Sequence, residues 1–122
     1  MTVFSVLGGV AVAHHVRAAY SREDVTMEGT VTDFIWRNPR AQVVFEVKDA
    51  DGEVVEWRGE YSSVTSMMAA GMTRNTFKPG DVIRFEARVA TSGAPYAVLG
   101  AAWRADGTLI VQGDYTDLTR GN

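Results

Sequence analysis

From residue 25 onward, apolar residues recur at every second position, the spacing of strands that bury one face. The apolar residues first occupy odd positions, at Met27, Gly29 and Val31, and then move to even positions, at Phe34 and Trp36. Such a one-residue slip would turn the apolar face toward water unless a β-bulge absorbs the extra residue. We therefore expect a first strand that bends at a bulge, as the closure of a small barrel requires.

The next two strands are expected to form a hairpin. Residues 41–47 carry apolar side chains at every odd position, and the alternation resumes at Val55 and Trp57. Between these segments, Asp49-Ala50-Asp51-Gly52 has the composition of a tight turn, because Gly52 adopts a positive φ at little cost.

The period then changes from that of a strand to that of a helix. Ser62 or Ser63 is suited to cap a helix, and Gly71 is suited to end it. The apolar residues between them recur at helical spacing, at Val64, Met67 and Met68. The pattern predicts a helix of about two turns, too short to be stable unless it packs on the rest of the chain. We expect it to close one end of the barrel, with both methionines on its packing face rather than at a metal site.

Two turns separate the remaining strands. Lys78-Pro79-Gly80-Asp81 fits a type II turn, and the strand after it alternates from Ile83 to Val89. A further strand follows Pro95, with an expected inner face of Leu99, Ala101 and Trp103. Asp106-Gly107 predicts a last hairpin, which leads to Leu109 and Val111.

Three strands, a short helix and two more strands are the order of an OB-type barrel. We therefore expect a mainly β protein, a small OB-like β-barrel of five to six strands with one short helix between strands 3 and 4. Residues 14–113 are assigned to this single domain, residues 1–13 to the remnant of a signal peptide, and residues 114–122 to a tail.

The N-terminal segment is apolar from Val3 to Val12, and Ala11-Val12-Ala13 resembles a signal-peptidase site. This stretch is too short to cross a bilayer, which takes about 20 residues, so no stable membrane insertion is expected. Met1-Thr2 lacks the usual positive charge, which we attribute to a longer leader. The segment predicts a periplasmic or secreted protein. The alternative is a short strand or helix packed on the barrel.

Charge argues against nucleic acid as a partner. The formal net charge is −3, and the 12 Lys and Arg residues are scattered among 15 Asp and Glu residues. Binding to phosphates normally requires a basic face, which this distribution does not supply. The chain contains no Cys, which excludes disulfides and thiolate chemistry.

Several short motifs give the chain a resemblance to an uncharacterised family of small exported bacterial proteins. The motifs span residues 14–111 and comprise His14-His15, Gly29-Thr30-Val31, Trp36-x-Asn38-Pro39, Trp57, Gly71-Met72-x-Arg74, Lys78-Pro79-Gly80-Asp81 and Asp106-Gly107-Thr108. The chain departs from the family at Arg40, where His is usual, and at Met72, where Trp is usual. The resemblance implies export and a β-rich fold, and it implies no activity.

His14 and His15 are the candidate metal ligands. If a peptidase cuts after Ala13, the α-amine and ring nitrogen of His14 can chelate one Cu(II) ion, a metal that imidazole suits. His15 is awkward as a third ligand because it is adjacent in sequence. The alternative is that both histidines form a flexible polar start, without a cofactor.

The segment Trp36-Arg37-Asn38-Pro39-Arg40 is the candidate ligand site. Its two arginines flank a turn beside an aromatic ring, an arrangement that can hold an anionic or sugar-like ligand. Alternatively, Trp36 packs in the core and the arginines are solvated. Tyr61 and Tyr96 lie at strand ends and are expected on the rim of the site, whereas Trp57 and Trp103 are expected in the core.

The sequence contains none of the motifs of nucleophilic, zinc-dependent or nucleotide-dependent catalysis. We therefore expect no enzyme, but a non-catalytic exported binding or accessory module that recognises a small ligand or a protein partner. The alternatives are a copper-binding protein that uses His14, and a small scaffold subunit of an exported complex.

Overall fold

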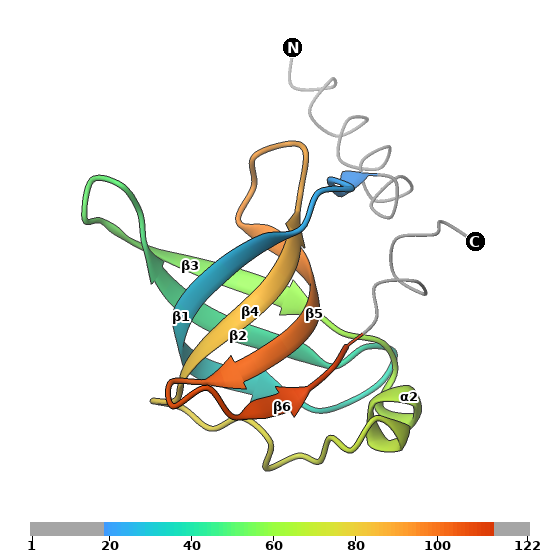
Figure 1. Ribbon diagram of the computed structural model, residues 1–122. Helices are drawn as coiled ribbons and strands as arrows, with labels where there is room; N and C mark the ends of the chain where they lie inside the picture. The colour runs from blue at the N-terminus through green and yellow to red at the C-terminus, as the bar shows by residue number, and fades with distance from the viewer. Residues whose placement is uncertain (1–18, 114–122) are drawn as a thin grey trace.

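The computed structural model describes residues 19–113, which form a mainly β domain with one short helix (Figure 1). The elements follow in the order β1 (Val25–Ile35), β2 (Gln42–Lys48), β3 (Val54–Glu60), α2 (Val64–Ala69), β4 (Val82–Val89), β5 (Tyr96–Arg104) and β6 (Leu109–Val111). The expected leader, tail and histidine pair lie outside the described residues.

The strands form a closed barrel. Their order in the sheet is β3-β2-β1-β4-β5-β6, and a parallel pairing of β3 with β5 joins the ends of the five-stranded part. This closure aligns Arg58 with Tyr96 and Glu60 with Val98. The five strands, with α2 between β3 and β4, have the connectivity of an OB-like barrel, and β6 is an added strand on β5. The expected fold is confirmed.

The long first strand bends where the apolar pattern slips. Its first half pairs with β4 and its second half with β2, and the register against β2 shifts between Val31 and Asp33. Thr32 is therefore the extra residue, and its hydroxyl donates to the Val44 carbonyl at 3.3 Å. The predicted β-bulge is confirmed. It lets the same strand belong to both sides of the barrel.

A second irregularity corrects the expected inner face of β5. Ala87 pairs with Leu99 but Phe85 pairs with Ala102, so β5 has one residue more than β4 between these pairs. The inward set therefore continues at Ala102, and the prediction that Trp103 faces the core is wrong. Trp103 lies opposite Arg84, whose guanidinium is 5.1 Å from the centre of the indole ring. Periodicity alone could not show this shift.

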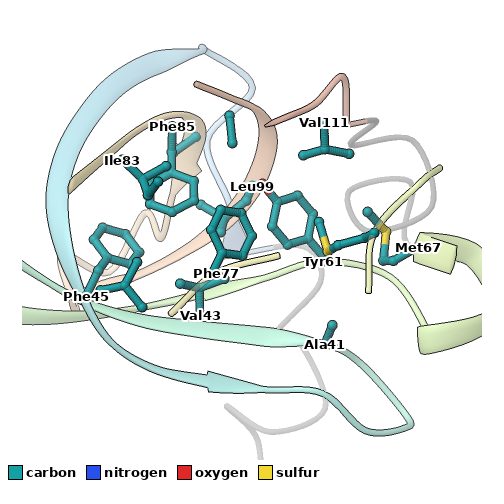
Figure 2. Close-up of a cluster of buried hydrophobic side chains, with 14 of the residues drawn as sticks. Ala41, Val43, Phe45, Tyr61, Met67, Phe77, Ile83, Phe85, Leu99 and Val111 are labelled. Atoms are coloured by element: carbon teal, nitrogen blue, oxygen red, sulfur yellow. The ribbon is translucent and has the colours of Figure 1, made fainter. Parts of the chain in front are cut away.

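Aromatic rings fill the barrel (Figure 2). Phe85 lies 4.8 Å from Phe45 and 5.7 Å from Phe77 between ring centres, and Phe77 meets Phe34 edge-on at 5.1 Å. Tyr61 stacks on Phe77 at 6.4 Å. Each such pair adds about 0.5–1.5 kcal/mol beyond the burial of its apolar area.

The helix α2 closes the barrel at the end where Tyr61 lies. Ser63 caps it, because the Ser63 hydroxyl accepts a hydrogen bond from the Ser66 amide at 3.2 Å. Met67 is buried in the core cluster, as expected, but Met68 is 60% exposed, so its assignment to the packing face is wrong. In this short helix only one of the adjacent methionines faces the barrel.

Glycine permits the closest contact at the β3–β5 closure. A Cβ atom on Gly59 would lie 2.5 Å from a methyl carbon of Leu99, which is fully buried. The two strands therefore approach each other closely only because this position has no side chain. No helix among residues 19–113 is long and apolar enough to cross a membrane.

Candidate functional site

A pocket of about 370 Å³ lies between the residue that follows β1 and the chain that leaves α2. We call it the Trp36 pocket, and its lining consists of Trp36, Met68, Gly71, Met72, Thr73 and Arg74. Its volume lies within the range of about 300–1,000 Å³ typical of small-molecule sites.

The apolar wall of this pocket is built from both sides. Trp36 is half-buried, and its indole packs at 5.5 Å against Phe34. On the other side, Gly71 adopts a φ of 95°, which turns the chain at the end of α2. The Met72 amide then donates to the Met67 carbonyl at 2.9 Å, and the Met72 side chain is buried. The wall is therefore held by the fold itself.

Arg74 supplies the cation of the pocket. Within residues 19–113 its guanidinium has no hydrogen bond or ion pair. The turn that carries it is fixed, since the Thr73 amide donates to the Thr76 hydroxyl at 2.7 Å and the Asn75 amide donates to the Thr73 hydroxyl at 3.2 Å. An apolar wall with one uncompensated guanidinium suits a ligand that has an apolar body and an acidic group.

Asn38 has a structural role beside the pocket. Its side-chain oxygen accepts a hydrogen bond from the Val64 amide at 3.0 Å, one of the amides at the start of α2 that lack a partner within the helix. Asn38 therefore joins the β1–β2 loop to the helix. Arg37 is exposed and is not part of the pocket lining.

Arg40 lies in a different environment from Trp36. The pKa of Tyr20 is raised to about 12, chiefly by burial and then by the charge of Glu60 and the phenol of Tyr96, while the Arg40 charge lowers it. Glu60, Tyr96 and Arg40 thus all lie within electrostatic range of Tyr20, and none of them lines the Trp36 pocket. The structure divides the ligand site expected from the sequence into two places.

The second place is a notch of about 220 Å³ where β3 meets the β4–β5 loop. Its lining consists of Glu56, Trp57, Arg58, Pro95 and Tyr96. The Arg58 guanidinium donates to the side-chain oxygen of Gln42 at 2.6 Å, and the Gln42 amide donates to Glu60 at 3.4 Å. Polar groups dominate here, in contrast to the Trp36 pocket.

Tyr61 does not lie on the rim of either hollow, and that expectation is wrong. Its side chain is 1% exposed, and its hydroxyl donates to the Gly100 carbonyl at 2.9 Å. The residue follows β3 directly into the barrel and serves the core. Tyr96, in contrast, is 49% exposed and lines the notch.

Sequence reasoning did not select Met68, Met72 or Arg74 as site residues. Gly71-Met72-x-Arg74 was visible as a motif, but nothing in the spacing placed it beside Trp36. Among residues 19–113, no three His, Asp or Glu side chains converge as a metal ion would need. His14 and His15, and with them the copper hypothesis, lie outside this part of the chain.

Two of the motifs noted in the sequence meet at the Trp36 pocket, where Trp36 faces the segment from Gly71 to Arg74. A model of DUF6152, a family of unknown function, matches residues 3–98. The chain belongs to this family. The DUF6152 match includes every residue that lines the two hollows. Neither the curated proteins nor the solved structures gave a match.

Proposed function

We propose that this DUF6152 protein is a non-catalytic, exported binding module that holds a small ligand in the Trp36 pocket. The observation that carries the proposal is the combination of a preformed apolar wall with Arg74, which has no partner in the described region. A guanidinium at an apolar site is an effective partner for a carboxylate, because it binds both oxygens in one plane.

The chemistry of the lining favours a flat, unsaturated ligand that carries one carboxylate. The indole of Trp36 offers a stacking surface, and the thioethers of Met68 and Met72 make favourable contacts with aromatic rings. Polar binding is concentrated at one point, Arg74. A ligand without an acidic group would leave this cation unused.

The proposal of export rests on the sequence of residues 3–13, an apolar stretch that ends in a small-residue cleavage pattern. Mass spectrometry of the protein from a periplasmic extract tests it, and we expect a chain that begins at His14. A chain that keeps the apolar segment and stays with the cytoplasmic fraction would contradict export, but it would not affect the pocket.

Binding at the pocket is tested with 2-naphthoate as the probe and its neutral amide, 2-naphthamide, as the comparison. We expect 2-naphthoate to shift the backbone amide signals of Trp36 and residues 68–74 in NMR spectra, and to bind more tightly than 2-naphthamide. Arg74→Gln should weaken 2-naphthoate binding at least about tenfold, the typical loss of a charged hydrogen bond. It should change 2-naphthamide binding little.

Arg37→Gln is the matched control, because it removes an exposed guanidinium near the pocket that does not line it. This variant should keep the affinity of the wild type. An absence of saturable shifts with 2-naphthoate, or an equal loss in both arginine variants, would contradict the proposed site.

A further inference from the structure

The notch opens onto a second surface, on the outer side of the barrel closure. We call this surface the β3 face, and its residues are Gln42, Glu56, Arg58, Glu60 and Tyr96. Their positions follow from register: Gln42 is opposite Glu60 on β2, and Tyr96 is opposite Arg58 on β5. Neighbouring strands therefore present these side chains side by side.

The polar groups of the β3 face are already ordered. Gln42 links Arg58 to Glu60, with contacts of 2.6 Å and 3.4 Å. Because each side chain is held by its neighbour, a ligand that binds them freezes few additional rotamers. Planar guanidinium, amide and carboxylate groups in a row supply both donors and acceptors, as a polyhydroxylated ligand requires.

Tyr96 adds an aromatic surface at the edge of this row. Its side chain is 49% exposed, although it lines the notch together with the half-buried Trp57. A tyrosine combines an apolar ring face with a polar tip. A sugar ring has the complementary arrangement, with C–H bonds on its faces and hydroxyls around its edge.

The charges of this region disfavour a polyanion. Two carboxylates, Glu56 and Glu60, accompany the single guanidinium of Arg58 on this surface, and the charges of Glu60 and Arg40 act in opposite directions on Tyr20. A phosphate or sulfate chain needs an excess of cations, and it would meet two carboxylates here. A neutral ligand meets no such repulsion.

The free edge of β3 beside the notch offers room for more than one sugar ring. β3 pairs with β5 only from Arg58 to Glu60. The first part of β3, Val54–Trp57, is therefore not paired with β5, and its edge lies free beside the notch. Val54 is 57% exposed at the far end of this stretch. In OB-like barrels, this part of the sheet and the loop between strands 4 and 5 are where oligomeric ligands bind.

We infer that the β3 face binds a neutral oligosaccharide, with one sugar ring on Tyr96 in the notch and further rings along Val54–Trp57. This site is separate from the Trp36 pocket and does not depend on the function proposed for it. The recognition chemistry is that of uncharged sugars, through ring stacking and hydrogen bonds to the row formed by Arg58, Gln42 and Glu60.

The test uses cellohexaose, maltohexaose and N-acetylchitohexaose as neutral probes, and a heparin hexasaccharide as the polyanion. NMR spectra of the full chain should show that at least one neutral probe shifts the amide signals of residues 54–58, 96 and 97 at millimolar concentration. Tyr96→Ala should weaken this binding at least about fivefold, a loss typical of one aromatic contact. Tyr96→Phe should keep most of the affinity.

Two further variants distinguish the site from a change in fold. Gln42→Ala should weaken binding without touching Tyr96, because it releases Arg58 from its 2.6 Å contact. Leu109→Ala removes an equally exposed apolar side chain on β6 and should have no effect. All variants should bind 2-naphthoate as the wild type does if the Trp36 pocket is the separate site proposed above.

The inference is overturned if no neutral probe shifts these signals, or if heparin binds more tightly than every neutral probe. It is also overturned if Tyr96→Ala and Leu109→Ala bind the probes equally well. If the wild type binds a neutral sugar probe as expected but does not bind 2-naphthoate, the function proposed for the Trp36 pocket is refuted and the β3 face remains supported.

Discussion

The two ends of the barrel use aromatic residues in opposite ways. At the helix end, next to α2, Tyr61 and Phe77 are almost fully buried and stacked. At the loop end, where the turn at residues 49–53 and the loop at residues 90–95 lie (Figure 1), Tyr96 remains half-exposed. The core is thus completed where a helix covers the barrel, whereas Tyr96 stays half-exposed at the end that carries only loops.

The difference shows that residue type does not decide whether an aromatic ring serves the core of this fold, because of two tyrosines only Tyr61 is buried. Both Tyr61 and Tyr96 sit beside the β3–β5 closure, at the end of one strand and at the start of the other. Tyr61 leads into the cap formed by α2, whereas Tyr96 follows the loop at residues 90–95, whose Thr91 hydroxyl donates to the Ala19 carbonyl.

The largest effect is expected from Tyr61→Ala, which removes a buried ring from the helix end. We expect a loss of about 3–5 kcal/mol in the free energy of unfolding, as for other buried aromatic residues cut back to alanine. Urea unfolding measures it. Tyr61→Phe keeps the ring and loses the hydrogen bond to Gly100, about 1 kcal/mol. Equal losses in the two variants would show that the ring does not support this end.

Gly59→Ala tests the closure that lies between the two ends. The added methyl group would meet the Leu99 side chain at 2.5 Å, and we expect overpacking to cost about 1–3 kcal/mol. The double variant Gly59→Ala with Leu99→Ala should recover part of the overpacking penalty relative to the sum of the single changes, because it provides space for the methyl group. Fully additive losses in urea unfolding would argue against this contact.

Asn38→Ala should weaken the attachment of α2 at the helix end. It leaves the Val64 amide without its acceptor, and the expected loss is about 1 kcal/mol. Hydrogen exchange should accelerate in residues 64–69 more than in β1 or β2. An unchanged exchange rate in α2 would mean that packing of Met67 alone holds the helix.

At neutral pH the smallest effect, close to none, is expected for Tyr20 at the loop end, because its contribution appears only at alkaline pH. Burial raises the pKa of Tyr20 to about 12, so the folded chain keeps this proton at a pH where the unfolded chain, near its ordinary value of 10.0, loses it. Stability is therefore unaffected well below pH 10 and falls as the pH rises from about 10 toward 12. Tyr20→Phe should flatten this fall in urea unfolding curves, and an identical slope in both proteins would refute the assignment.

Most of the fold was predictable from the sequence, because strand and helix periods differ and the turns carry distinctive residues. The slip between Val31 and Phe34 even located the bulge of β1. The bulge of β5 was missed because Gly100, Ala101 and Ala102 are all small, so no change of polarity marks the slip. Trp103 was consequently assigned to the wrong face.

The candidate sites were less predictable, since they depend on which segments meet in space. Trp36 was selected, but its partners come from residues 68–74, and spacing along the chain cannot show that contact. Arg40 was grouped with Trp36 because they are neighbours in sequence, although its charge acts on Tyr20 and it does not line the Trp36 pocket. Tyr61 and Tyr96 have similar sequence contexts, and only burial distinguishes them.

The parallel pairing of Arg58–Glu60 with Tyr96–Val98 also constrains how the chain can assemble. Every other pairing within the barrel is antiparallel, and both this parallel pairing and that of β1 with β4 join segments separated by the helix and at least one whole strand. Such distant contacts form late and slowly. While the chain is being synthesised, β3 therefore keeps an unpaired edge until β5 emerges from the ribosome, and during that interval the nascent protein is most exposed to chaperones, proteases and aggregation.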